Sequence, residues 1–173
     1  MNFFQRLFTP AKGREVYLPL YKAVVAEART PAWYADGAVP DTLDGRFDMV
    51  GAILSLVLIR LESEGAPGQE PAVLLTEIFV DDMDGQLREE GIGDIIVGKH
   101  IGKMMSALGG RIAAYRTGTE ERDTLDGALI RNLYRGEVPA PESLKIVRDR
   151  FLSVHAQLKA LPLAAILTGT ITA

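Results

Sequence analysis

The chain of 173 residues contains no cysteine and only two histidines, His100 and His155. The lack of cysteine excludes disulfides, iron–sulfur ligation, cysteine-based zinc sites and thiol nucleophiles, and it fits a reducing compartment. Neither histidine has a glutamate three residues before it, so the pattern of helical di-iron sites is absent as well. We therefore expect neither a metal nor a cofactor.

Sequence motifs of common catalytic sites are also missing. No serine lies in a G-x-S-x-G pattern, and no G-x-x-x-x-G-K-[ST] phosphate-binding loop occurs. The segment Gly91-Ile92-Gly93 begins like a dinucleotide-binding fingerprint, but isoleucine occupies position 96, where the third glycine belongs. These absences predict a protein that is not an enzyme.

The chain also has no large excess of charge of either sign and no long hydrophobic run. Nineteen basic and 23 acidic residues give a net charge of −4, which provides no general basic surface for DNA. The longest apolar run, Met49–Ile59, is much shorter than the roughly 20 residues that cross a bilayer. The first eight residues also lack the apolar centre of a signal peptide, so we expect a cytoplasmic location.

Apolar residues recur with a period near 3.6, and proline and glycine separate the periodic segments. This pattern predicts an all-α, single-domain bundle of about six helices. The predicted helices cover residues 15–29, 41–64, 70–90, 94–117, 120–134 and 142–160. The second is apolar on every side, which places it at the centre of the bundle, with Asp41 or Thr42 as its N-cap. Residues 33–40 are predicted to form a loop whose Trp33 and Tyr34 pack into the core.

Four glycines lie inside the fourth predicted helix: Gly98, Gly102, Gly109 and Gly110. Each costs a helix about 1 kcal/mol relative to alanine. We expect another helix to cross closely at these positions and to compensate for that cost. A pocket for quinone, lipid or haem beside this glycine-rich helix is an alternative function.

The N-terminus has an unusual composition. Phe3, Phe4, Leu7 and Phe8 fall on one side of a short helix, and the first 14 residues carry three basic and no acidic side chains. A segment of this kind can lie in a membrane interface or dock in a protein groove, or it can fold back onto its own core. The predicted organisation is an amphipathic cationic segment (1–14), a helical domain (15–160) and an apolar tail (161–173). The tail could form a short helix, a strand-like extension or a disordered end.

Seven acidic residues lie between positions 77 and 94, with Arg88 as the one basic residue among them. The spacing of Asp84 and Arg88 predicts an i, i+4 ion pair on a solvated helix face. An acidic docking surface for a basic partner is the alternative. A third interpretation is an enzyme that uses Asp82, Asp94 and Arg88 as acid, base and anion clamp, which requires the three to converge in a cleft.

Several blocks of sequence together resemble one known family. They are Trp33-Tyr34-Ala35, the run from Val39 to Asp48 (VPDTLDGRFD), the run from Phe79 to Asp94 (FVDDMDGQLREEGIGD), Gly110-Arg111 with Tyr115, and Leu129-Ile130-Arg131-Asn132. This combination, spread over residues 15 to 155, is similar to the ubiquinol–cytochrome c chaperone family. Its mitochondrial members are all-helical assembly factors for the cytochrome bc complex, and this chain resembles a bacterial relative.

The resemblance implies a non-catalytic chaperone that binds newly made cytochrome b, or another subunit of the complex, and assists its assembly. It also implies contacts with the ribosome and a small partner protein. The N-terminal segment itself predicts peripheral contact with the cytoplasmic face of the inner membrane. We expect the apolar N-terminal residues Phe3, Phe4, Leu7 and Phe8 to contact the membrane or the client. The residues that match polar family positions form the remaining predicted site: Asp41, Thr42, Arg46, Asp82, Arg88, Asp94, Arg131 and Asn132. Helix caps and ion pairs that stabilise the fold are the alternative role for these polar residues.

Overall fold

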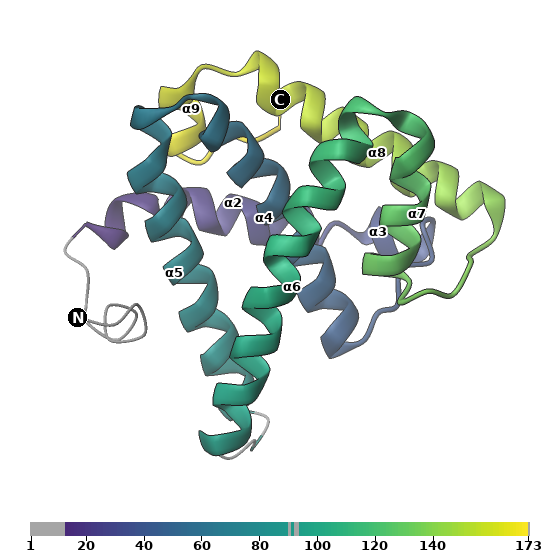
Figure 1. Ribbon diagram of the computed structural model, residues 1–173, viewed down its shortest axis with the longest axis horizontal. Coiled ribbons are helices and arrows are strands. Elements are labelled where there is room, and N and C mark those ends of the chain that lie inside the picture. The colour runs from purple at the N-terminus through teal and green to yellow at the C-terminus, as the bar shows by residue number, and fades with distance from the viewer. Residues whose placement is uncertain (1–12, 90, 92–93, 173) are drawn as a thin grey trace.

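The computed structural model describes residues 13–89, 91 and 94–172 (Figure 1). All regular structure in this part of the chain is helical, which confirms the all-α prediction. The elements are η1 (Arg14–Tyr17), α2 (Leu18–Ala28), α3 (Pro31–Ala35), α4 (Leu43–Ser63), α5 (Ala66–Glu89), α6 (Asp94–Glu120), α7 (Arg122–Leu133), α8 (Pro141–Ala160) and α9 (Leu163–Leu167). None of the described helices combines the length and apolar character needed to span a membrane.

Helix α4 lies at the centre of the bundle, as predicted. Every residue from Phe47 to Leu58 is buried, and α2, α5, α6, α7 and α8 all contact this helix. A helix that is apolar on all sides is stable in water only when protein surrounds it. The hydroxyl oxygen of Thr42 accepts a hydrogen bond of 3.1 Å from the amide of Gly45, so Thr42 is the N-cap of α4.

Helices α5 and α6 form an antiparallel hairpin whose tip extends beyond the rest of the bundle (Figure 1). The predicted close crossing at the glycines of α6 is wrong. A Cβ atom added at Gly98, Gly102, Gly109 or Gly110 would meet no described atom of a neighbouring element within 4 Å. All four glycines are exposed, and Gly98 and Gly102 lie toward the projecting tip of the hairpin. The glycines therefore lie on an open face of α6.

The segment after α2 forms a short helix, α3, where the sequence predicted a loop. Pro31 begins it, because the fixed φ angle of proline suits the first turn of a helix. Trp33 is fully buried, as predicted, and its indole nitrogen donates a 2.8 Å hydrogen bond to the carbonyl of Glu27. The guanidinium of Arg150 lies 5.1 Å from the centre of the indole ring. These contacts attach α3 to α2 and α8.

The C-terminal tail packs against the bundle. It contains the short helix α9, which contacts α2, and Ile166 and Ile171 are buried. Gly169 has a φ of 100°, and a Cβ atom there would lie 2.9 Å from the carbonyl oxygen of Pro19. Of the three possibilities for the tail, the short helix is the one observed, and glycine is needed where the chain turns back to α2.

Candidate functional site

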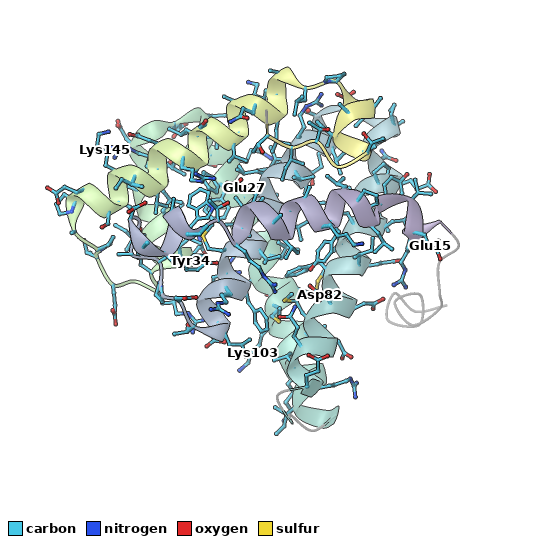
Figure 2. All side chains as sticks on the ribbon, turned by 180° about the vertical axis from the view of Figure 1, so that it is seen from behind. Glu15, Glu27, Tyr34, Asp82, Lys103 and Lys145 are labelled. Atoms are coloured by element: carbon cyan, nitrogen blue, oxygen red, sulfur yellow. The ribbon has the colours of Figure 1, made fainter. Side chains whose placement is uncertain are left out.

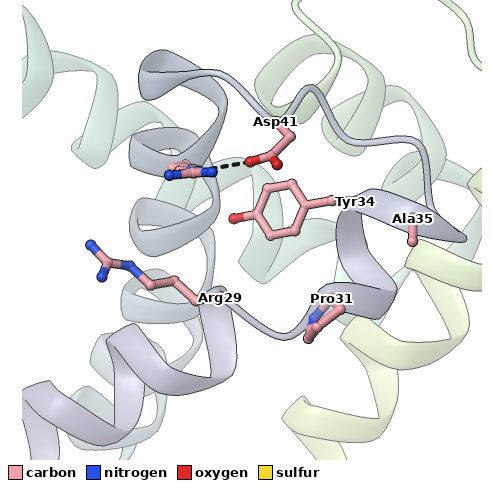
Figure 3. Close-up of a pocket in the computed structure, with 6 residues that line it drawn as sticks. Arg29, Pro31, Tyr34, Ala35 and Asp41 are labelled. Carbon is pink, nitrogen blue, oxygen red and sulfur yellow. Dashed lines mark hydrogen bonds and ion pairs between the residues drawn. The ribbon is translucent and has the colours of Figure 1, made fainter.

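Three predicted site residues lie together at the start of α4. The Nε of Arg46 donates a 2.7 Å hydrogen bond to Oδ1 of Asp41 (Figure 3). Thr42, between them in the sequence, caps the helix. Arg46 and Asp41 line a surface pocket of about 590 Å³. The remaining residues of its lining are Arg29, Pro31, Tyr34 and Ala35. The structure thus joins the Trp33-Tyr34-Ala35 block to the VPDTLDGRFD block at one pocket.

This pocket carries more positive than negative charge. The hydrogen bond from Arg46 lowers the pKa of Asp41 below its ordinary value, so this carboxylate is ionised at neutral pH. Burial raises the pKa of Tyr34, whose hydroxyl donates to the carbonyl of Ala28 at 2.8 Å. Arg29 is exposed, and no acidic side chain among the described residues pairs with it. One cation at the pocket is therefore available to an external group.

Asp82 lies in a neighbouring groove between α2 and α5 (Figure 2). The hydroxyl of Tyr21 donates a 2.6 Å hydrogen bond to Oδ2 of Asp82. Burial is the main cause that raises the pKa of Tyr21, and the contact with Asp82 adds to it, so the phenol remains protonated and continues to donate. Beside this pair, Arg14 contacts both Asp81 and Glu77. Asp81 and Asp82 of the groove thus have partners within the chain.

The other predicted site residues do not join this region. Arg88 pairs with Asp84 at 2.6 Å, as the i, i+4 spacing predicted. Asn132 donates to the carbonyl of Ala128 within α7, and Arg131 is exposed on the same helix. Asp94 is the first residue of α6, and its side chain lies outside the described structure, as do all of Phe3, Phe4, Leu7 and Phe8.

The geometry gives no support to an acid–base site on the acidic segment. Asp82 is bound by Tyr21 in the α2–α5 groove, whereas Arg88 pairs with Asp84 and does not line that groove. In the part of the chain that the structure describes, no three acidic or histidine side chains are grouped to hold a metal ion. The arrangement of α2, α3 and α5 instead offers surface hollows with apolar walls and exposed cations.

A buried cluster of charged residues was not predicted from the sequence. Asp48 is the one buried charged residue of the described chain, and its two oxygens accept hydrogen bonds from Arg111 of α6 and Arg135, which follows α7. Arg135 also reaches Asp44 at 3.0 Å. The nearby hydroxyl of Tyr115 is fully buried, and the ring of Tyr115 packs against that of Phe151. The cluster therefore connects α4, α6, α7 and α8.

This cluster explains several matching blocks of sequence. Asp48 ends the VPDTLDGRFD block, and Arg111 and Tyr115 form the Gly110-Arg111 block with its tyrosine. The sequence contained a signal for this cluster, because an aspartate inside a long apolar helix requires a buried partner. The identity of that partner was hidden, since Arg111 lies 63 residues away along the chain. We infer that these blocks stabilise the fold.

Comparisons with known proteins agree with this architecture. The family model described as "Ubiquinol-cytochrome C chaperone" matches residues 35–173. A solved structure, the crystal structure of the Cbp3 homolog from Brucella abortus, is 30% identical in sequence, with a TM-score of 0.79. The match covers 91% of this chain and 88% of that one. A search of curated proteins gave no match.

The family match extends over most of the helical bundle, from the end of α3 through α9. It includes the cap of α4, the Asp41–Arg46 pair, Asp82 and the buried Asp48 cluster. The similarity in three dimensions covers 91% of the chain. The chain therefore belongs to the ubiquinol–cytochrome c chaperone family.

Proposed function

We propose that this protein is a non-catalytic chaperone that binds newly made cytochrome b and assists assembly of the cytochrome bc complex. The observation that carries the proposal is the family match over residues 35–173. The similar structure from Brucella abortus, described as a Cbp3 homolog, supports the same assignment. The client is a bundle of membrane helices whose packing surfaces remain exposed until its partners arrive.

The structure is well suited to binding rather than turnover. The polar residues of the family blocks cap helices or form internal ion pairs, as Thr42, Asp41 and Asp48 do. The two hollows beside α2 are open surfaces with mixed apolar and charged walls. Contact surfaces of this kind suit an unfinished protein, because binding needs area and charge but no reacting group.

Deletion of the gene tests the proposal directly. We expect the cells to lose assembled cytochrome bc complex, measured by the reduced-minus-oxidised haem b spectrum and by native gel electrophoresis. A plasmid copy of the wild-type gene should restore both signals. A deletion strain with a normal spectrum and a normal amount of complex would refute the proposed function.

A photo-crosslinking residue at Tyr34, in the pocket beside α3, tests whether cytochrome b is the client. We expect this position to capture cytochrome b in growing cells. The control is Glu142, which is exposed on α8 and does not line the pocket. The same experiment also detects the ribosome or a small partner protein. Equal capture of cytochrome b from both positions would argue against a specific contact.

We also propose that residues 1–8 attach the protein to the cytoplasmic face of the membrane. Phe3, Phe4, Leu7 and Phe8 carry enough apolar area for a reversible interfacial contact, and the nearby basic residues favour anionic lipid. Serine at these four positions should move the protein from the membrane fraction to the soluble fraction. Glutamine at Arg6 and Lys12 is the control that separates charge from apolar contact. An unchanged distribution after the serine substitutions would exclude this role.

A further inference from the structure

The outer side of α2 carries two adjoining hollows. The pocket beside α3 was described above, and the larger groove, about 820 Å³, lies between α2 and α5. Arg29 lines both, so the hollows meet at this residue. Figure 2 views this side of the molecule, with α2 lying across it.

The groove between α2 and α5 has an apolar floor. Ile78 of α5 and Tyr21 of α2 are buried at its base, and Val25 is half-buried beside them. Leu18 also lines the groove and is 39% exposed, so it adds apolar surface at the rim. This floor can accept the apolar side of another helix.

The acidic residues on the α5 side of the groove already have partners. Asp81 pairs with Arg14, and Asp82 accepts a hydrogen bond from Tyr21. On the α2 side, Lys22 and Arg29 are exposed and pair with no side chain in the described part of the chain. Glu15, the remaining carboxylate of the lining, lies at the N-terminal end of the groove. Tyr21 is neutral, so Asp82 keeps its negative charge on the α5 side, whereas the unpaired charge on α2 itself, at Lys22 and at the C-cap Arg29, is positive.

The spacing of the two cations defines what they can bind. Lys22 and Arg29 are seven residues apart, which is two helical turns, so they lie on the same side of α2 about 10 Å apart along its axis. Two carboxylates seven residues apart on a partner helix have the same separation. They would flank the apolar stripe of that helix and face the two cations while the stripe covers the groove floor.

We propose that the α2–α5 groove binds an amphipathic helix of a client or partner protein through its apolar stripe and through two acidic residues spaced seven apart. The inference rests on the proposed function, since the helix would belong to an unfinished subunit or to a protein that assists with it. A membrane surface is the other anionic candidate. A flat bilayer would contact the rim at Lys22 and Arg29 but would leave the recessed Ile78 and Tyr21 uncovered, so the groove favours a helix.

Fluorescence anisotropy with the full chain and designed peptides tests the inference. The probe is a labelled peptide of about 18 residues, long enough to be helical, with leucines along one side and two glutamates seven positions apart beside them. Two matched peptides carry lysine or glutamine in place of the glutamates. We expect the glutamate peptide to bind at least about tenfold more tightly than the lysine peptide, and we expect rising salt to weaken its binding.

A charge swap makes the test specific. The double variant Lys22→Glu/Arg29→Glu should bind the glutamate peptide about tenfold less tightly and should bind the lysine peptide better than the wild type does. Lys103→Glu, which reverses an exposed charge on α6, is the matched control and should change neither affinity. Far-ultraviolet circular dichroism confirms that each variant is folded. If the double variant does not fold, Lys22→Gln/Arg29→Gln provides the same comparison.

Three results would overturn the inference. The first is no binding of the glutamate peptide, and the second is equal affinity for the acidic and basic peptides. The third is binding of phosphatidylglycerol vesicles that depends on Lys22 and Arg29 while the peptides do not bind, which would assign the surface to the membrane.

Measurements in cells separate this inference from the proposed function. A deletion strain that retains normal cytochrome bc complex would refute the chaperone assignment, whatever the peptides do. A deletion strain that lacks the complex and is fully rescued by Lys22→Glu/Arg29→Glu would refute the groove inference alone. Loss of rescue by this variant, with rescue by Lys103→Glu, would support both.

Discussion

Replacement of Asp48 is the most informative test of the fold. Its side chain is 7% exposed in the middle of the bundle, and it holds Arg111, which is 17% exposed, and Arg135, which is 53% exposed. The substitution Asp48→Leu keeps a side chain of similar size and removes the negative charge. It leaves the guanidinium of Arg111 inside the bundle without a counter-charge.

The expected cost follows from the exposure of the two arginines. Removal of one partner from a buried ion pair destabilises a protein by about 3–5 kcal/mol, and the partial exposure of Arg111 places the effect near the lower end. Arg135 is half-exposed and retains its contact with Asp44, so loss of the Asp48–Arg135 contact contributes less than about 1 kcal/mol to the destabilisation. We therefore expect a loss of about 3 kcal/mol, which lowers the thermal midpoint of a chain of this size by roughly 6–12 °C.

Urea unfolding of four proteins provides the assay: the wild type, Asp48→Leu, Arg111→Met and the double variant. We expect the double variant to be more stable than Asp48→Leu, because it has no unpaired buried charge. Asp44→Asn is the control, since Asp44 contacts the same Arg135 from an exposed position and should cost under about 1 kcal/mol. If Asp48→Leu costs no more than Asp44→Asn, or if the cycle shows no coupling, the account of this cluster is incorrect.

Three further predictions concern single elements. Thr42→Ala should lower the free energy of unfolding by about 1 kcal/mol because the N-cap of α4 is lost, while Thr42→Ser should retain most of it in urea unfolding. Alanine at Gly98 and Gly102 should raise the thermal midpoint, since each removes up to about 1 kcal/mol of helix cost and meets open space; a lower midpoint would show that another element covers these glycines. Burial, with a contribution from Lys159, lowers the pKa of His155, so the unfolded chain takes up a proton first as the pH falls below 6.5 and stability decreases there. His155→Gln should flatten that part of the profile of midpoint against pH, and an unchanged slope would contradict the assignment.

Local signals in the sequence were sufficient for much of the fold. The all-round apolar character of residues 47–58 predicted the central helix, and Thr42 was identified as a possible cap from its position before that run. Trp33 was predicted in the core and is fully buried. These predictions succeeded because helix periodicity, capping and burial of large apolar side chains depend on residues that are close together in the chain.

Contacts between residues that are far apart in the sequence could not be predicted from the sequence. The glycines of α6 have the pattern of a close helix crossing, yet whether a helix covers them depends on how far the α5–α6 hairpin projects from the bundle. Asp82, which the sequence analysis placed in a candidate site, accepts a hydrogen bond from Tyr21, and the two residues are 61 positions apart in the sequence. The candidate groove arose only when α2 packed beside α5.

By itself, the sequence determined the helices, the buried centre and the family, because these follow from short-range patterns and from blocks of matching residues. Tertiary structure alone decided which charges are paired within the chain, as at Asp48 and Asp81, and which remain available, as at Lys22 and Arg29. The physical reason is that electrostatic pairing depends on distances of a few ångströms between side chains, and only the packing of the helices sets those distances.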